Sequence, residues 1–230
     1  MSQDGSPKRA TITDMMRNAQ GQPLDYSFME LKTMAEVLEE EPFAGHRKPR
    51  AQPEVEVVEE VKEKDAKEKD AEKGAKVPEK AAPVVQISNA VRLSNNLLEN
   101  LNGFNHVMKE ILYQPSMLAW IDLSHNLLTE IPKGFAKYEH LNVIYLHANN
   151  IQKIKEVEKL SGLKKLRSIT LHGNPIETQK FYRLTVIGIL PNLRSLDFSV
   201  LTVLDRERAM MHKETQEKRR AAALERARDA

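Results

Sequence analysis

Two histidines stand at matching places in two similar motifs, His147 in LHANN and His172 in LHGNP. If the motifs belong to neighbouring parallel strands, the two imidazole rings lie about 5 Å apart, which is close enough to share a metal ion. Zinc sites use at least three protein ligands, and the sequence offers no obvious third ligand for this pair. We therefore interpret the histidines as polar residues on the rim of the fold and expect no metal and no other cofactor.

No other residue pattern indicates a reaction centre. The glycines form neither a G-x-G-x-x-G turn nor a P-loop, and the chain contains no G-x-S-x-G elbow and no H-E-x-x-H motif. It has no cysteine, which rules out a disulfide framework and a thiol nucleophile. The formal net charge of +2 is too small to indicate a polyanionic partner. We expect a protein that is not an enzyme.

The two histidine motifs belong to a longer pattern, L-x-x-L-x-L-x-x-N-x-L, that recurs along the chain. It is found in SNAVRLSNNLL, LAWIDLSHNLL, LNVIYLHANNI and LRSITLHGNPI. A fifth copy, LRSLDFSVLTV, assigns Phe198 to a core position but has Leu201 where asparagine is expected. The four asparagines are 30, 23 and 25 residues apart, close to the period of about 20–29 in leucine-rich repeats. The pattern predicts an α/β leucine-rich repeat solenoid with short parallel strands on its concave face.

Asparagine suits the sharp turn that follows each strand. Its amide offers hydrogen-bond donors and an acceptor, so it can satisfy backbone groups of its own coil and of the neighbouring coil. We predict that stacking of the coils brings four side chains into a structural ladder, made of Asn96, Asn126, Asn149 and Asn174.

Side chains that alternate away from the core should line the concave face. This alternation places the single tryptophan, Trp120, beside Tyr145 on the next strand. Aromatic residues and arginine contribute most to protein–protein binding, so we predict a partner-binding face here. Its predicted members are Trp120, Tyr145, Arg92, Asp122, Arg167 and Val143. The alternative is that the N-terminal part of the chain covers Trp120.

Composition divides the chain into four parts. Residues 1–50 form an N-terminal extension, in which helical spacing of apolar residues predicts a short helix near residues 30–40. Residues 51–83 are a charged low-complexity linker that has too few apolar side chains to form a core. Residues 84–204 form the repeat domain with a C-terminal cap, and residues 205–230 form one charged helix.

An apolar island from Leu24 to Phe43 interrupts the polar N-terminal extension. A solenoid needs a cover over each open end, because an uncovered core and an unpaired strand edge lead to aggregation. The island is our candidate for the N-terminal cover. The alternative is that it docks on a partner, and its docking residues are then Leu24, Tyr26 and Phe28.

Several motifs together resemble one family. PLDYSF and EEP, followed in order by LAWIDLSHNLLTEI, LNVIYLHANNIQ and LRSITLHGNPIE, are similar to the leucine-rich repeat-containing protein 51 family. The resemblance covers residues 23–42 and about 91–208. It implies a non-enzymatic cytoplasmic scaffold that is a structural component of the ciliary or flagellar axoneme, with dynein- or microtubule-associated proteins of that cytoskeleton as partners.

Two alternative functions remain open, a nucleic-acid-associated repeat protein of the splicing type and a phosphatase-regulatory repeat protein. The arginines expected on the concave face alternate with aspartates, which does not favour a phosphate-binding stripe, so nucleic acid is not the expected partner. The sequence has no apolar run of about 18 residues and begins with a polar stretch. We therefore expect a soluble intracellular protein without a membrane partner.

Overall fold

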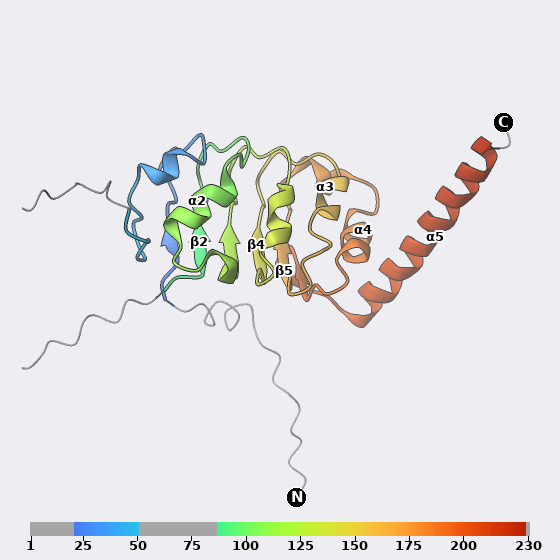
Figure 1. Ribbon diagram of the computed structural model, residues 1–230. Helices are drawn as coiled ribbons and strands as arrows, with labels where there is room; N and C mark the ends of the chain where they lie inside the picture. Colours follow the sequence, from blue (N-terminus) through green and yellow to red (C-terminus); the bar gives the residue numbers. More distant parts are fainter. Residues whose placement is uncertain (1–20, 51–86, 229–230) are drawn as a thin grey trace, which may run out of the picture.

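The computed structural model describes residues 21–50 and 87–228 (Figure 1). The predicted linker, residues 51–83, lies outside this range. Seven short strands form one sheet in the order of the sequence. They are β1 (Leu24–Asp25), β2 (Ala90–Arg92), β3 (Trp120–Asp122), β4 (Val143–Tyr145), β5 (Ser168–Thr170), β6 (Ser195–Leu196) and β7 (Ser199–Val200). The first six strands are parallel, and β7 pairs with β6 in the antiparallel sense.

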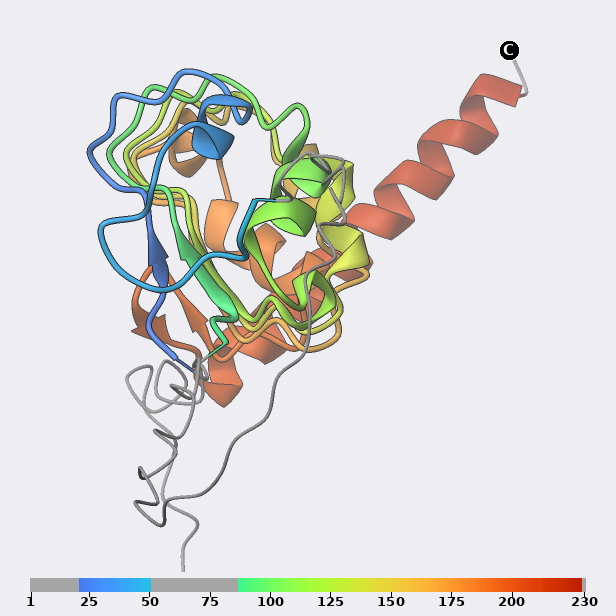
Figure 2. The ribbon, with the colours of Figure 1, turned by 60° about the vertical axis from the view of Figure 1, so that its left-hand side comes forward.

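The repeats stack in register, because the same position of each repeat pairs with its equivalent in the next. The middle residues Val91, Ile121, Ile144 and Ile169 follow one another across the sheet, and all of them are fully buried. Short helical segments form the opposite wall of each coil (Figure 2). They are α2 (Phe104–Ile111), η2 (Pro115–Met117), η3 (Lys133–Lys137), α3 (Lys155–Glu158), η4 (Pro175–Thr178) and α4 (Tyr182–Ile189). The structure is the predicted leucine-rich repeat solenoid.

The four predicted asparagines lie inside the turns and connect neighbouring coils. The Asn126 amide donates to the carbonyl oxygens of Leu123, in its own coil, and Leu93, in the preceding coil, at 3.1 and 2.9 Å. Its oxygen accepts the backbone N–H of Leu98 at 3.1 Å. Asn96, Asn149 and Asn174 bond in the same way: each amide donates to carbonyl oxygens of its own coil and of the preceding unit. The oxygens of Asn149 and Asn174 likewise accept a backbone N–H from the preceding coil.

A left-handed backbone precedes each of these asparagines, and it makes the turn tight. The residues with positive φ are Asn95, His125, Ala148 and Gly173, and Phe28 occupies the equivalent place near β1. A Cβ atom at Gly173 would lie 3.3 Å from the backbone nitrogen of Ala148. Residues of very different type adopt this left-handed conformation, so the stacking of the coils imposes it rather than the residue's own preference.

Residues 21–50, which we call the N-terminal segment, add a partial coil to the first repeat. β1 extends the sheet, and Tyr26, Leu31 and Met34 are buried against the first coil. The expected helix near residues 30–40 is present only in part: the segment bends repeatedly and forms the short 3-10 helix η1 (Glu36–Leu38). The reason is that Glu30 has a positive φ of 56°, a left-handed conformation that does not fit a right-handed helix beginning at residue 30.

At the other end, α4 covers the core with Tyr182, Val186 and Ile187. It is followed by β6, β7 and the long helix α5 (Val203–Arg228). α5 crosses α4 at Gly188, where an added Cβ would lie 3.5 Å from the carbonyl oxygen of Ala209, and its C-terminal half extends away from the repeats (Figure 1). None of the helices in the described ranges combines the length and the apolar character that crossing a membrane requires.

Candidate protein-binding face

The predicted binding residues lie on the concave face, but four of the six are buried. Trp120, Val143, Tyr145 and Asp122 are between 2 and 8% exposed. Neighbouring strands bring their side chains into contact, so that the rings of Trp120 and Tyr145 meet edge to face at 6.0 Å between centroids. The expectation that Trp120 and Tyr145 are exposed binding anchors is therefore wrong. They form a small apolar cluster, together with Ala90 and Val143, beneath the accessible surface.

Arg92 is half-buried and is tied to acidic neighbours on both sides. Its guanidinium lies 3.0 Å from the Asp25 carboxylate on β1 and 3.9 Å from the Asp122 carboxylate on β3. It also lies 5.4 Å from the centroid of the Trp120 ring, within the range of a cation–π contact. Burial alone would raise the pKa of Asp25, but hydrogen bonds from Ser27 and the charge of Arg92 hold it below the ordinary value of 3.8.

Arg167 does not join this group. Its guanidinium donates to the carbonyl oxygens of Lys164 and Leu166 at 2.8 and 3.2 Å, and to that of Asn192 at 3.4 Å. The side chain is thus turned toward the loops that precede the strands. Arg167 was predicted to border Trp120 and Tyr145 on the binding face, and its guanidinium instead bonds to carbonyl groups of these loops.

A cluster of four rings forms the accessible part of the face, made of His125, His147, His172 and Phe198. The rings of His147 and His172 stack at 4.8 Å with an angle of 6° between their planes. His125 meets His147 edge to face at 5.3 Å. Phe198 is 50% exposed and lies 5.7 and 5.6 Å from His147 and His172. We call these residues the ring cluster.

Phe198 was expected in the core, and its position on the concave face corrects that interpretation. Asp197 and Phe198 both have positive φ, of 50° and 60°, which reverses the chain between β6 and β7. The Phe198 ring consequently lies against Tyr145, at 5.5 Å, and not inside the fifth coil. The repeat pattern carried no signal of this reversal beyond the missing asparagine at Leu201.

Asp197 holds the reversal in place. One carboxylate oxygen accepts the backbone N–H groups of Leu171 and His172 at 2.6 and 3.0 Å. The other accepts the hydroxyl of Tyr182 at 2.8 Å. Burial and the charge of Asp197 raise the pKa of Tyr182, so this hydroxyl keeps its proton. The ring cluster thus rests on a backbone that three hydrogen bonds fix.

The histidines do not assemble into a metal site. His147 Nδ1 lies 2.9 Å from the hydroxyl of Thr170, and His172 Nδ1 lies 3.5 Å from the Asp197 carboxylate. Burial lowers the pKa of His147, and the neighbouring His172 lowers it further. Within residues 21–50 and 87–228, no group of three or more His, Cys, Asp or Glu side chains has the geometry to hold an ion.

The N-terminal docking residues are divided between interior and surface. Leu24 and Tyr26 are completely buried against the first coil, whereas Phe28 is 71% exposed. In the structure the segment therefore acts as the cover over the first repeat, which is one of the two roles that the sequence left open.

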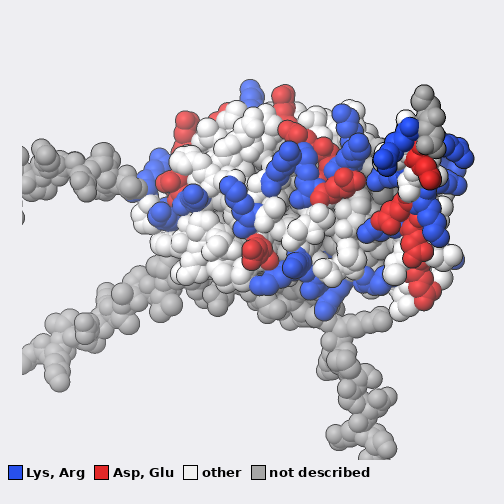
Figure 3. Space-filling model, turned by 45° about the vertical axis from the view of Figure 1, so that its right-hand side comes forward, with Lys and Arg blue, Asp and Glu red and all other residues white. Residues whose placement is uncertain are grey.

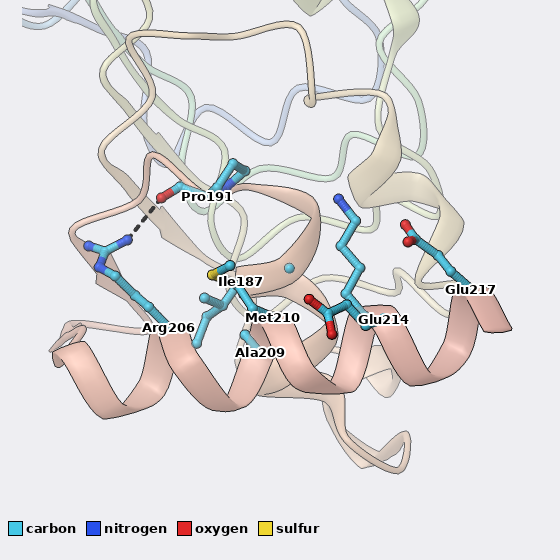
Figure 4. Close-up of a pocket in the computed structure, with 9 residues that line it drawn as sticks. Ile187, Pro191, Arg206, Ala209, Met210, Glu214 and Glu217 are labelled. Carbon is cyan, nitrogen blue, oxygen red and sulfur yellow. Dashed lines mark hydrogen bonds between the residues drawn. The ribbon is translucent and has the colours of Figure 1, made fainter.

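A groove between α5 and α4 is a second recess of the surface (Figure 4). It has a volume of about 320 Å³, and its apolar lining includes the buried Ile187 and Ala209 and the exposed Met210. Arg206 fixes one end by donating to the carbonyl oxygen of Pro191 at 2.8 Å. Basic and acidic side chains are interspersed on the surface around α5, so this region has no single sign of charge (Figure 3).

Comparison with known proteins identifies the family. A family model described as "Leucine-rich repeat" matches residues 53–226. Leucine-rich repeat-containing protein 51 of Bos taurus is 38% identical over 199 residues, which cover 86% of this chain and 88% of that protein. The probable U2 small nuclear ribonucleoprotein A' of Drosophila melanogaster is 30% identical over 60% of this chain and 50% of its own length.

A solved structure resembles part of the fold. The crystal structure of the Drosophila melanogaster SNF/U2A' complex contains a chain that is 28% identical, with a TM-score of 0.48, over 57% of this chain and 75% of that one. The repeat pattern, the parallel sheet and the extent of the similarity to the bovine protein agree. The chain belongs to the leucine-rich repeat family of leucine-rich repeat-containing protein 51.

Proposed function

We propose that the chain is a non-enzymatic adaptor that binds a protein partner at the ring cluster of its concave face. Leucine-rich repeat domains are interaction modules, and repeat solenoids offer extended concave surfaces for binding. The observation that carries the proposal is the position of Phe198. A large aromatic side chain stands half exposed on a backbone that is held by Asp197 and is therefore rigid.

Rigid aromatic anchors lose little conformational entropy on binding, and they dominate the energetics of many interfaces. The buried cluster of Trp120 and Tyr145 supports Phe198 from below, since the Tyr145 ring contacts both of the others. The three histidines add polar atoms around the anchor. Trp120 and Tyr145 therefore contribute indirectly, by positioning the surface that the partner contacts.

The location of the adaptor is the finer part of the proposal. The family resemblance implies the ciliary axoneme, with dynein- or microtubule-associated partners. Proximity labelling from the full-length chain in ciliated cells tests both parts. We expect labelling of axonemal proteins by the wild-type chain, and labelling confined to nuclear factors would contradict this location.

A substitution in the ring cluster tests the proposed binding face independently of the proposed location. Phe198→Ala should weaken partner binding by about 30-fold, which corresponds to a contact of about 2 kcal/mol. Val200→Ala is the matched control, because Val200 is exposed on the adjacent strand β7 and outside the ring cluster. Equal labelling by the Phe198→Ala chain and the wild-type chain would show that the partner binds elsewhere.

A nucleic-acid-associated role is the second candidate, and the similarity to the probable ribonucleoprotein A' favours it. The structure offers little for phosphate binding on the concave face, because Arg92 is paired with Asp25 and Asp122. We expect no RNA binding in a filter or gel-shift measurement at low ionic strength. Affinity that appears there and falls steeply with salt would support this second role.

A further inference from the structure

The N-terminal segment contacts the first coil in the way that a bound peptide contacts a receptor. β1 adds one strand to the edge of β2, with Leu24 opposite Val91 and Asp25 opposite Arg92. Beyond β1, the backbone N–H of Tyr26 donates to Arg92 at 2.9 Å, and that of Phe28 donates to Ser94 at 3.2 Å. Addition of an extended peptide to a sheet edge is a common mode of peptide recognition.

Asn96 binds the backbone of the segment at three points. Its amide nitrogen donates to the carbonyl oxygen of Tyr26 at 2.9 Å. Its oxygen accepts the N–H groups of Met29 and Leu31 at 3.0 and 3.1 Å. The other three rungs of the ladder each accept a single backbone N–H. Asn96 therefore holds the segment more completely than the other rungs hold their neighbouring coils.

The side chains of the segment supply anchors and a charge. Leu24, Tyr26, Leu31, Met34 and Val37 are at most 2% exposed in the core that they share with the first coil. Asp25 forms the ion pair with Arg92 at 3.0 Å, so the edge selects an acidic residue between two apolar ones. The first coil thus contacts three kinds of group on the segment: its backbone, its apolar side chains and its charged Asp25.

All of these contacts join residues 21–50 to the first coil, and the covalent link to β2 runs through residues 51–86, outside the described ranges. The described segment ends at Arg50, and the described chain resumes at Ile87. Near the end of the segment, the Lys48 N–H donates to the carbonyl oxygen of Ile111 at 2.9 Å. We propose that the outer edge of β2, with Arg92 and Asn96, is a peptide-binding site that the chain fills with its own N-terminal segment. The same site takes the N-terminal segment of a second copy.

The link determines which copy occupies the site. A covalent connection between a segment and its site gives an effective concentration of the order of mM, so each chain fills its own site at ordinary concentrations. Cutting the link removes this effective concentration, so that occupancy of the site then depends on the affinity for the segment and on the concentration of free segment. At protein concentrations that approach the mM range, exchange of segments between two chains produces a dimer without any new contact.

The first experiment uses the full-length chain with a protease recognition sequence placed between residues 60 and 75. The cut protein is unfolded and refolded by dilution in the presence of a fluorescent synthetic peptide of residues 21–50. Gel filtration and fluorescence anisotropy then measure the peptide that is retained. We expect the peptide to replace the cut segment and to elute with the repeat domain.

Variant peptides test the recognition without altering the repeat domain. Tyr26→Ala removes a fully buried aromatic side chain, and the peptide should bind at least about 100-fold more weakly. Phe28→Ala is the matched control on the same peptide, because Phe28 is exposed, and its affinity should stay within about threefold of the unmodified peptide. Equal binding of the Tyr26→Ala and unmodified peptides would overturn the proposed site. Failure of the cut protein to refold with the peptide, under conditions in which the uncut protein refolds, would overturn it as well.

The second copy is tested with the uncut chain. Sedimentation should show a dimer that grows with concentration after refolding in the sub-mM to mM range. An excess of the unmodified peptide should suppress this dimer, and the Tyr26→Ala peptide should not. A chain that stays monomeric throughout, or a dimer that the peptide leaves unchanged, would contradict segment exchange.

Discussion

At the N-terminal end, the edge of the parallel sheet is covered by a segment that returns from a distant part of the sequence. Asp25 of β1 forms an antiparallel bridge with Ala44, which closes the outer edge. At the C-terminal end, the chain closes the edge directly, as β7 turns back onto β6. Both ends therefore finish the parallel sheet with antiparallel pairing, so that within the described residues neither outer strand presents a long unpaired edge.

The two ends differ in the polar side chain that binds the backbone of the last structural unit. Asn96 faces a segment that offers both a carbonyl oxygen and N–H groups, and an amide can bond to both kinds. Asp197 faces only donors, namely two N–H groups and the Tyr182 hydroxyl, and a carboxylate accepts all three. The residue type at each end thus follows from what its neighbour supplies.

The largest effect is expected at the N-terminal end. Tyr26→Ala leaves a cavity between the segment and the first coil, and we expect a loss of about 3–5 kcal/mol in the free energy of unfolding. Denaturant unfolding followed by circular dichroism measures it. Phe28→Ala should change this free energy by less than about 0.5 kcal/mol, since the side chain is exposed. Similar losses for both variants would show that the segment contributes no buried core.

An intermediate effect is expected at the C-terminal end. Asp197→Ala leaves the N–H groups of Leu171 and His172 without their acceptor, at a cost of about 1–3 kcal/mol. Tyr182→Phe removes one of the three hydrogen bonds to Asp197 and should cost about 1 kcal/mol. The same unfolding measurement ranks the two variants. A larger loss for Tyr182→Phe than for Asp197→Ala would mean that the Asp197 carboxylate is not the main group that stabilises the C-terminal end.

The smallest effect is a pH dependence that separates the two ends. The pKa of His147 is lowered in the folded chain, so the unfolded chain binds the proton first and stability falls as pH drops below about 6.5. The pKa of Asp25 is also lowered, so its contribution is present above 3.8 and is lost as pH falls below that value, through the folded pKa. Acidification should therefore weaken the C-terminal end first.

Hydrogen exchange at single residues measures this order. Protection of the His172 N–H should decrease as the pH falls below about 6.5, whereas protection of the Tyr26 N–H should decrease only below about pH 3.8. His147→Gln should remove the first change and Asp25→Asn the second. Loss of protection at both sites in one step would show that the two ends unfold as a single unit.

The sequence predicted the middle of the molecule better than its ends. The repeats have a fixed period, so the pattern placed strands and asparagines in register. β1 escaped notice although LDYS at residues 24–27 matches IDLS at residues 121–124, because Met29 stands where the ladder asparagine would be. The two motifs even form the same turn, in which Asp25 accepts from Ser27 and Asp122 from Ser124.

The binding face was predicted only in part, because the exposure of each side chain depends on contacts with neighbouring strands, which the pattern of a single repeat does not show. Trp120 and Tyr145 lie on the predicted face, but contacts between strands bury them. Phe198 reaches the face only through the reversed backbone at Asp197, and the repeat pattern ends before that point. His125 was missed since it stands one residue before its asparagine, whereas His147 and His172 stand two residues before theirs.

The recurring left-handed residue has a consequence for how such a molecule can change in size. Every coil carries its own strand, its own bend and its own amide, and the bend accepts residues as different as histidine, alanine and glycine. Duplicating a stretch such as residues 118–140 would therefore add one coil without redesign of either terminus. The N-terminal and C-terminal covers determine the structure of the two ends, whereas the number of coils between them can change by whole repeats.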